Sequence, residues 1–317
     1  MPHMKSRKPF PRWIWLLAGV AAVILLFSLL ALFTPIPHNF ALNLELQSAL
    51  KAEKEKRYLT AERKLKAYTT KAPGNEEAEG RLMIAAFYNE DFVTFLEQFT
   101  KLKDKEMKDR ELFAEINAVM VKAAFYYPTD AIKNFSTIYP VLTAVPDSAW
   151  DNYFSRSPAD VNAKEVYAEE LFREQRYARC DSVIEDILSS HDDYMPALTT
   201  GASGKRKEED YDKALEYDKK MLMINPESLN GLSSEVMTLL LLKQDADALD
   251  VALQAYKLDD KNPFVSSSLI LAYHYNDRKA ERDALIRKAS KEAVDSGDKK
   301  ALQYALDVIS RKEKFRN

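Results

Sequence analysis

The hydrophobic positions of this chain repeat with the period of an α-helix. In Ala163–Leu188 and Ser233–Leu258, apolar residues occur at i, i+3, i+4 and i+7, the pattern of an amphipathic helix. Only 7 of the 317 residues are glycine, and no stretch beyond the N-terminus shows sustained period-2 alternation of β-branched residues. We therefore predict an all-α fold.

The helical segments recur at a constant spacing, in a frame that places the helix-ending proline near the end of each repeat. The period of roughly 34 residues is typical of helix–turn–helix solenoids, in which each unit buries its apolar face only by stacking on its neighbours. The predicted repeats begin at Leu42, Glu76 and, in a looser copy, Leu112, and then at Val161, Met195, Leu229 and Pro263. Solenoids of this kind bind other molecules and rarely catalyse reactions themselves.

One segment, Tyr211–Pro226, carries a family resemblance. An aromatic residue opens it, the small residue Ala214 follows three positions later, bulky apolar residues come next, and Asn225-Pro226 ends it. This order resembles the second helix, helix B, of a tetratricopeptide repeat (TPR). The small residue of helix B is Ala61, Ala131, Ala214, Ala248 and Cys180 in five repeats, and the opening aromatic residue is Tyr58, Phe92, Tyr177 and Tyr211 in four.

The resemblance covers residues 42–139 and 161–289. The first helix, helix A, matches the family less well, and Phe95 replaces the small residue of the second repeat. After Pro263 the helix B pattern shifts by about two residues. The resemblance implies a right-handed TPR-type α-solenoid of about six to seven helix pairs, and it implies a protein-binding scaffold rather than a particular activity.

A different segment, Trp13–Phe33, contains no charged residue over its whole length. At ~1.5 Å per residue this helix would extend ~31 Å, the thickness of a bilayer core. We predict a single transmembrane anchor. The alternative is a cleaved signal peptide, but the apolar run exceeds the usual length of roughly 7–15 residues and no small-x-small cleavage site follows it.

Charge predicts the orientation of this anchor. Lys5, Arg7, Lys8 and Arg12 precede it, and no Lys or Arg occurs in 35–50. By the positive-inside rule the N-terminus stays in the cytoplasm and the TPR domain is extracytoplasmic. The rival topology, an organelle-surface receptor whose repeats face the cytosol, runs against this bias.

The sequence divides into seven parts. They are a cytoplasmic tail (1–12), the anchor (13–33), a linker (34–41), a first TPR array (42–139), an insert (140–160), a second TPR array (161–289) and a C-terminal capping helix (290–317). The capping helix carries Ala301, Leu302, Ala305, Leu306 and Ile309 on one face. In the insert, Trp150, Tyr153 and Phe154 either form a short helix that plugs the joint between the arrays or expose an aromatic anchor for a partner.

Composition argues against several function classes. Without the four basic residues that precede the anchor, 42 Lys and Arg remain against 49 Asp and Glu, a net charge of −7, which disfavours nucleic-acid binding. The four histidines are far apart in sequence and no pair has metal-ligand spacing, so neither a metal site nor a cofactor is expected. Cys180 is the only cysteine, which excludes an internal disulfide. No catalytic motif is found, and we do not expect an enzyme.

In TPR proteins the concave groove is lined by the second, fifth, ninth, twelfth and thirteenth residues of each repeat. The corresponding residues with binding character here are Phe87, Tyr88, Met120, Phe172, Arg173, Arg206, Leu240, His274 and Tyr275. Apolar and aromatic side chains with a few basic ones suit an extended or helical peptide. The alternative for each of these residues is packing inside the solenoid.

These observations predict a membrane-anchored TPR scaffold or adaptor that binds a protein or peptide on the extracytoplasmic side of the membrane. Such a scaffold can be part of a membrane complex. Two alternatives stay open. One is a chaperone-like factor for exported proteins, and the other is a non-catalytic accessory subunit of a membrane complex.

Overall fold

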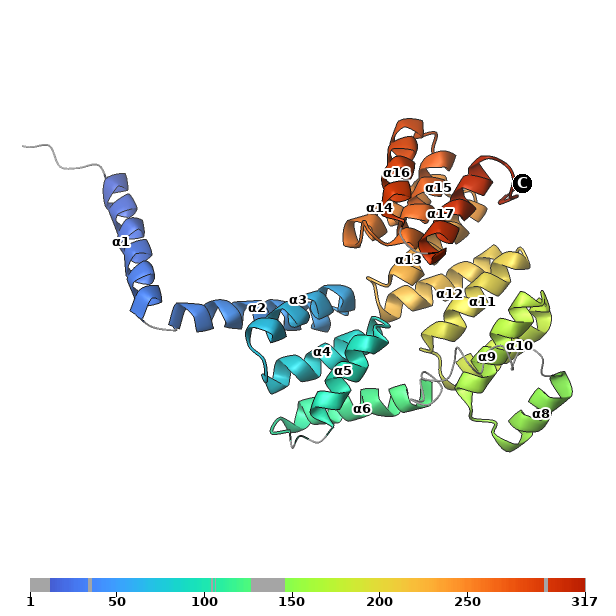
Figure 1. Cartoon of the computed structure of the whole chain (residues 1–317), viewed down its shortest axis with the longest axis horizontal. Coiled ribbons are helices and arrows are strands. Elements are labelled where there is room, and N and C mark those ends of the chain that lie inside the picture. The colour runs from blue at the N-terminus through green and yellow to red at the C-terminus, as the bar shows by residue number, and fades with distance from the viewer. Residues whose placement is uncertain are drawn as a thin grey trace, which may run out of the picture.

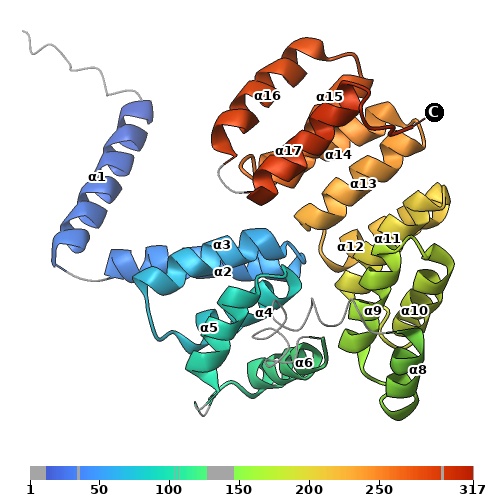
Figure 2. The same ribbon diagram turned by 45° about the vertical axis from the view of Figure 1, so that its right-hand side comes forward.

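A computed structural model of the chain describes residues 12–33, 36–103, 105, 107–126, 146–293 and 296–316. Within these ranges it contains sixteen α-helices and no strand, so the all-α prediction is confirmed. The helices form a stack of antiparallel hairpins from which α1 projects, as Figures 1 and 2 show.

The helices fall into six A–B pairs among the described residues. The earlier part of the chain contains α2 (Ile36–Lys54), α3 (Tyr58–Lys71), α4 (Glu76–Tyr88), α5 (Phe92–Leu102) and α6 (Arg110–Tyr126). The later part contains α8 (Asp147–Arg156), α9 (Val161–Arg173), α10 (Tyr177–Ser190), α11 (Met195–Lys207), α12 (Tyr211–Ile224), α13 (Leu229–Leu241), α14 (Asp245–Leu258), α15 (Pro263–Tyr275), α16 (Lys279–Glu292) and α17 (Ser296–Ile309).

The predicted repeat frame is confirmed at most helix starts. Helices α4, α9, α11, α13 and α15 begin at the predicted residues, and the B helices α10, α12, α14 and α16 start at the same constant interval. The predicted shift after Pro263 is wrong, because α16 begins in frame at Lys279. There Arg282 takes the place of the small residue and contacts His274, with 3.1 Å between its Nη1 and the histidine Nδ1.

The third repeat is also corrected. Helix α6 begins at Arg110, one full repeat after Glu76, whereas the sequence predicted a start at Leu112. The Asp109 carboxylate explains the difference, because its Oδ1 accepts hydrogen bonds from the backbone N–H groups of Glu111 (2.9 Å) and Leu112 (3.0 Å). It therefore caps the helix at a point where the sequence shows only mixed charges.

Each turn between helix A and helix B contains one residue in the left-handed region. These residues lie two positions before the start of helix B and have φ values between 56° and 63°; they are Lys56, Glu90, Gln175, Glu209, Lys243 and Asp277. Two of the six following helices, α5 and α12, are capped by an aspartate; in α12 the Asp210 side chain accepts from Lys213 N at 3.2 Å. The same short turn therefore joins the two helices of each of the six described pairs.

Small residues allow the two helices of a pair to approach closely. Ala61, Cys180, Ala214 and Ala248 are fully buried where helices A and B cross. Beyond the last pair, α17 packs on α15 through Ala301, Leu302 and Ala305, which are buried as the capping prediction required. It thereby covers the apolar side that α15 would otherwise expose.

The two arrays touch directly. Arg57, at the N-terminal end of α3, donates from Nε to Glu227 at 3.0 Å, and Arg63 donates from Nη2 to Asp259 at 3.0 Å. In addition, Asn225 Nδ2 donates to the backbone oxygen of Tyr88 at 3.2 Å. Both views place the start of α3 beside the turn between α12 and α13. The solenoid therefore returns onto its own N-terminal part.

Helix α1 (Arg12–Phe33) coincides with the predicted anchor. Among the side chains that the structure describes, which in α1 leave out 12–16, 18, 27 and 30–33, no helix provides an apolar stretch long enough to cross a membrane. The anchor and its orientation stay predictions. Most of the predicted cytoplasmic tail, and the insert residues before Pro146, lie outside the described residues.

Candidate functional site

The first array contains a groove with a volume of about 680 Å³. The A helices α2, α4 and α6 form its walls, and the turn before α3 closes one end. Its apolar lining is Leu50, Tyr58, Ile84, Tyr88 and Val119, and its main polar residues are Glu53, Arg81 and Glu115. A groove of this size and mixed character is typical of a binding site.

Arg81 lies at the centre of the polar lining. Its Nη1 donates to Glu53 Oε1 at 3.3 Å, and its Nη2 donates to Glu115 Oε1 at 3.2 Å. Burial raises the pKa of Glu53 to about 7, although Arg81 opposes that shift. Near neutral pH a fraction of Glu53 is therefore protonated, whereas Glu115 holds Arg81 through both of its carboxylate oxygens.

Two stacked tyrosines form the aromatic wall of this groove. The rings of Tyr58 and Tyr88 are 4.7 Å apart between centroids and inclined by 20°. Lys122 Nζ lies 5.9 Å from the centroid of Tyr88. Burial raises the pKa of Tyr58, so its ring stays neutral at physiological pH. A neutral aromatic wall beside polar groups suits an amphipathic peptide side chain.

The structure places the three predicted residues of the first array differently. Tyr88 lines the groove, whereas Phe87 is only 7% exposed. We correct its assignment: Phe87 packs in the core against Phe95, with ring centroids 5.8 Å apart, because Phe95 fills the usual small position of helix B. Met120 packs against the same core and does not line the groove, since α6 is two residues out of the predicted register.

Several groove residues were missed by sequence reasoning. Leu50 and Ile84 occupy the ninth position of their repeats, and Glu53 the twelfth, so the repeat frame alone would have located them. Arg81 and Glu115 lie 34 residues apart, at equivalent positions of consecutive repeats. Their opposite charges at that spacing were a signal of contact between neighbouring A helices.

A second groove, of about 450 Å³, lies on the second array. Of the predicted residues, Phe172 and Arg206 line it, together with Ser203, Tyr211, Met237 and Tyr304 among others. The C-terminal residues 313–316 form one of its walls. The C-terminal segment of the chain thus lines part of the second groove.

Arg206 is fixed in this groove by a buried polar cluster. Its Nη1 donates to Ser234 Oγ at 2.8 Å and its Nη2 donates to Ser203 Oγ at 3.0 Å. The fully buried Asp218 accepts from Ser234 and Thr238 and lies 3.6 Å from the guanidinium. Burial lowers the pKa of Arg206 and raises the pKa of Asp218. The cluster orients Arg206 and uses several of its donors.

The remaining predicted residues of the second array lie elsewhere. Leu240 is fully buried, so its groove assignment is corrected. It lies on α13 and packs in the core cluster that α13 shares with α14, α15 and α17. Arg173 is exposed outside both grooves and donates from Nε to Glu169 O at 3.3 Å. Burial and the neighbouring Arg282 lower the pKa of His274. Tyr275 packs on Phe315, with ring centroids 5.7 Å apart.

The three aromatic residues of the insert were predicted either to plug the joint between the arrays or to be exposed to a partner, and the structure divides them between these alternatives. Trp150 is 4% exposed and stacks on Phe154 and Tyr167, with ring centroids 5.6 and 5.2 Å away. Tyr153 is 43% exposed and its hydroxyl donates to Asp160 at 2.5 Å. Trp150 and Phe154 therefore pack α8 onto the second array, and only Tyr153 faces outward.

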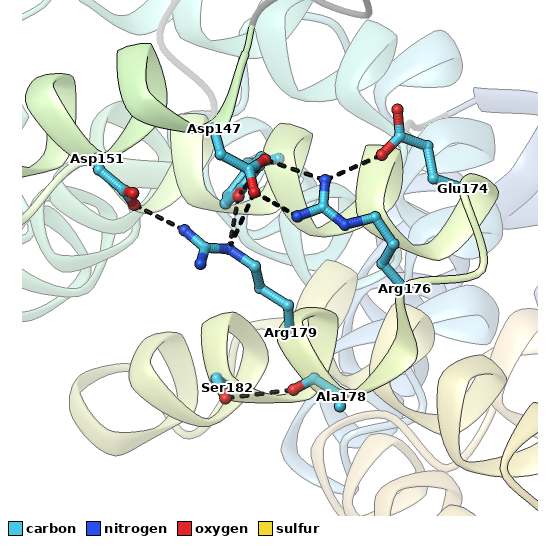
Figure 3. A network of polar contacts seen from close by, with 8 residues as sticks. Asp147, Asp151, Glu174, Arg176, Ala178, Arg179 and Ser182 are labelled. Atoms are coloured by element: carbon cyan, nitrogen blue, oxygen red, sulfur yellow. Dashed lines mark hydrogen bonds and ion pairs between the residues drawn. The ribbon is translucent and has the colours of Figure 1, made fainter.

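A polar network fixes α8 in place, as Figure 3 shows. Asp147 at the start of α8 accepts from both Nη atoms of Arg176, and it also accepts from Tyr167 Oη at 2.9 Å. Arg179 donates from Nη2 to Asp151 at 2.7 Å. The hydrogen bonds from Arg176 lower the pKa of Asp147 to about 2. These contacts favour a structural role for most of α8.

Comparison with known proteins shows only distant similarity. No protein-family model matches the chain, and no curated protein matches its sequence. Among solved structures, yeast Tom70 aligns with a TM-score of 0.42 and 14% identity, over 86% of this chain and 64% of that one. This chain thus spans less than two thirds of that structure.

Two further solved structures are TPR domains. The complex of the yeast Sti1 TPR2AB domain with pHSP90 aligns at a TM-score of 0.32 and 14% identity, over 80% of this chain and 99% of that one. The P58(IPK) TPR domain aligns at a TM-score of 0.31 and 12% identity, over 86% of this chain and 99% of that one. The repeat architecture rests on the regular register of the chain's own helices.

Proposed function

We propose that this chain is a membrane-anchored TPR scaffold that binds a peptide segment of a partner protein in the groove of the first array, on the extracytoplasmic side. The observation that carries the proposal is the groove itself, in which the stacked Tyr58 and Tyr88 lie beside Arg81. An apolar or aromatic side chain of the ligand would lie on the tyrosines, and a ligand carbonyl would accept a hydrogen bond from Arg81.

Site-specific photocrosslinking in intact membranes tests this proposal. A photoreactive amino acid at Leu50, which lines the groove, should capture a partner, and mass spectrometry identifies it. The matched control is Val93 on α5, which is 70% exposed and does not line the groove. Equal capture from both positions would place the partner outside the groove.

Substitution then tests the two chemical elements of the groove. Tyr88→Ala and Arg81→Ala should each lower partner recovery by at least about tenfold, since aromatic and arginine anchors are each worth roughly 2 kcal/mol at an interface. Val93→Ala should leave recovery unchanged. Circular dichroism must show that both groove variants retain their helical content. Undiminished recovery from folded variants would contradict the proposal.

The range of captured proteins separates the alternative functions. One partner in fixed proportion indicates a scaffold or an accessory subunit of a membrane complex. Many unrelated exported proteins, captured weakly, indicate a chaperone-like factor.

A further inference from the structure

The C-terminal end of the chain turns back into the groove of the second array. After α17 the chain reverses at Arg311, which has a φ of 59°, and Lys312 N then donates to Asp307 O at 2.9 Å. Residues 313–316 follow without regular secondary structure and line the groove. We call these four residues the C-terminal hook.

The hook ends in a built arginine site. Arg316 pairs with Asp245 through two hydrogen bonds, Nη1 to Oδ1 at 2.5 Å and Nη2 to Oδ2 at 2.9 Å. Its Nη1 also donates to the backbone oxygen of Leu240 at 2.6 Å, near the end of α13. The carbon of the guanidinium lies 3.9 Å from the ring centroid of Tyr275.

This combination selects arginine. A bidentate carboxylate and an aromatic face match the planar guanidinium, whereas the ammonium of lysine cannot satisfy both. The carbonyl end of α13 adds the negative end of a helix dipole. The Arg316 side chain is only 16% exposed, so the site encloses it.

Phe315 supplies the apolar half of the same recognition. It is partly buried against the core cluster of α13, α15 and α17, and its ring lies 5.7 Å from that of Tyr275. Tyr275 therefore contacts both residues of the hook. The second groove and the arginine site around Asp245 therefore bind an aromatic residue followed by an arginine, both on a segment without regular secondary structure.

We propose that the hook is an internal ligand, and that the same site binds a partner segment containing an aromatic residue followed by arginine, which displaces the hook. The inference rests on the proposed peptide-binding function and adds the chemistry of a second ligand segment. A tethered segment at an effective concentration in the millimolar range competes with such a partner until the partner segment displaces it.

A peptide with the sequence of residues 310–317 is the probe. It is labelled with a fluorophore and titrated into the detergent-solubilised full chain, either unchanged or carrying Phe315→Ala and Arg316→Ala. The double variant should bind the peptide at least about tenfold more tightly than the unchanged chain, because its own hook no longer competes. Adding Asp245→Asn should abolish that binding.

Two control peptides test the chemistry. In one, alanine replaces the arginine that corresponds to Arg316, and in the other lysine replaces it. Both should bind the double variant at least about tenfold more weakly than the original peptide. If the double variant loses helical content, Arg316→Ala alone, which leaves Phe315 in place, is used instead.

The proposal is overturned if a folded hook variant does not bind the peptide, if it binds no more tightly than the unchanged chain, or if the alanine peptide binds equally well. Its failure is distinguishable from failure of the proposed function. Photocrosslinking from Leu50 reports on the first groove alone, whereas the peptide titration reports on the site around Asp245.

Discussion

Glu227 caps the N-terminus of α3 although 167 residues separate it from Thr60 in the chain. Its carboxylate accepts from the backbone N–H of Thr60 at 2.7 Å and from the Thr60 hydroxyl at 2.8 Å. Arg57, which stands at the N-cap position, makes no capping hydrogen bond with its own side chain. The second array therefore supplies the cap that the first array lacks.

Glu227→Ala should destabilise this junction by about 1–3 kcal/mol, because it leaves the Thr60 N–H without its acceptor and removes one of the ionic partners of Arg57. Hydrogen exchange should accelerate first in α3 and in the turn between α12 and α13. The exposed Glu97 on α5 provides the control, since Glu97→Ala touches neither segment. Unchanged protection of α3 would show that the contact does not couple the arrays.

Ala214→Leu and Ala248→Leu should each overpack a crossing of helices A and B. Both alanines are fully buried, and the expected loss of unfolding free energy is about 1–3 kcal/mol. The damage should appear first in the adjacent repeats, as measured by hydrogen exchange. Ala246 is exposed on the same helix as Ala248, so Ala246→Leu should be tolerated. Full stability of both buried variants would contradict the observed packing.

Glu165 should make the protein less stable as the pH rises. Burial raises its pKa from 4.5 to about 8, and its Oε2 has no hydrogen-bond partner among the described residues. Between these values the folded protein keeps a proton that the unfolded chain has lost. The free energy of unfolding therefore falls as the pH rises from 4.5 through about 8.

Glu165→Gln tests that prediction, because glutamine keeps an oxygen for the hydroxyl of Thr200 but does not ionise. Melting temperatures at about pH 5 and about pH 8 should differ less in this variant than in the unchanged protein. Glu97→Gln should keep the full difference. If the melting temperature of the Glu165→Gln variant falls between the two pH values as much as that of the unchanged protein, the pH dependence belongs to other groups, such as Glu53.

The proposed topology predicts an extracytoplasmic C-terminus. Lys5, Arg7, Lys8 and Arg12 precede the predicted anchor, and a reporter fused after Asn317 should be active only outside the cytoplasm. The chain should also remain in the membrane after carbonate extraction. A cytoplasmic signal would reverse the orientation, whereas release of a shortened soluble form would indicate a cleaved signal peptide.

Local signals in the sequence were enough to locate most helices. Aromatic, small and proline residues recur at fixed positions, and they identified helix starts such as Val161, Met195 and Leu229. The frame failed at α6, because the charged run 101–111 offers no clear apolar start before Leu112. It also misplaced Phe87, whose burial depends on the bulky Phe95 opposite it.

The candidate sites depended on contacts that no local pattern encodes. Tyr88 was predicted in the first groove, but its partner Tyr58 was assigned only to the opening of a B helix. The hook was missed because residues 310–317 are polar or charged apart from Phe315, and no local pattern shows where they pack. Only the folded chain brings Arg316 to Asp245, 71 residues away.

The left-handed turns between the paired helices have a consequence for the protein's tolerance of sequence change. An L-residue in this conformation costs roughly 1 kcal/mol or more, and glycine adopts it without that cost. None of the seven glycines of the chain occupies any of the six turn positions from Lys56 to Asp277. Glycine at these six positions should therefore raise the thermal stability, by the part of that cost that exceeds glycine's own greater loss of backbone entropy on folding.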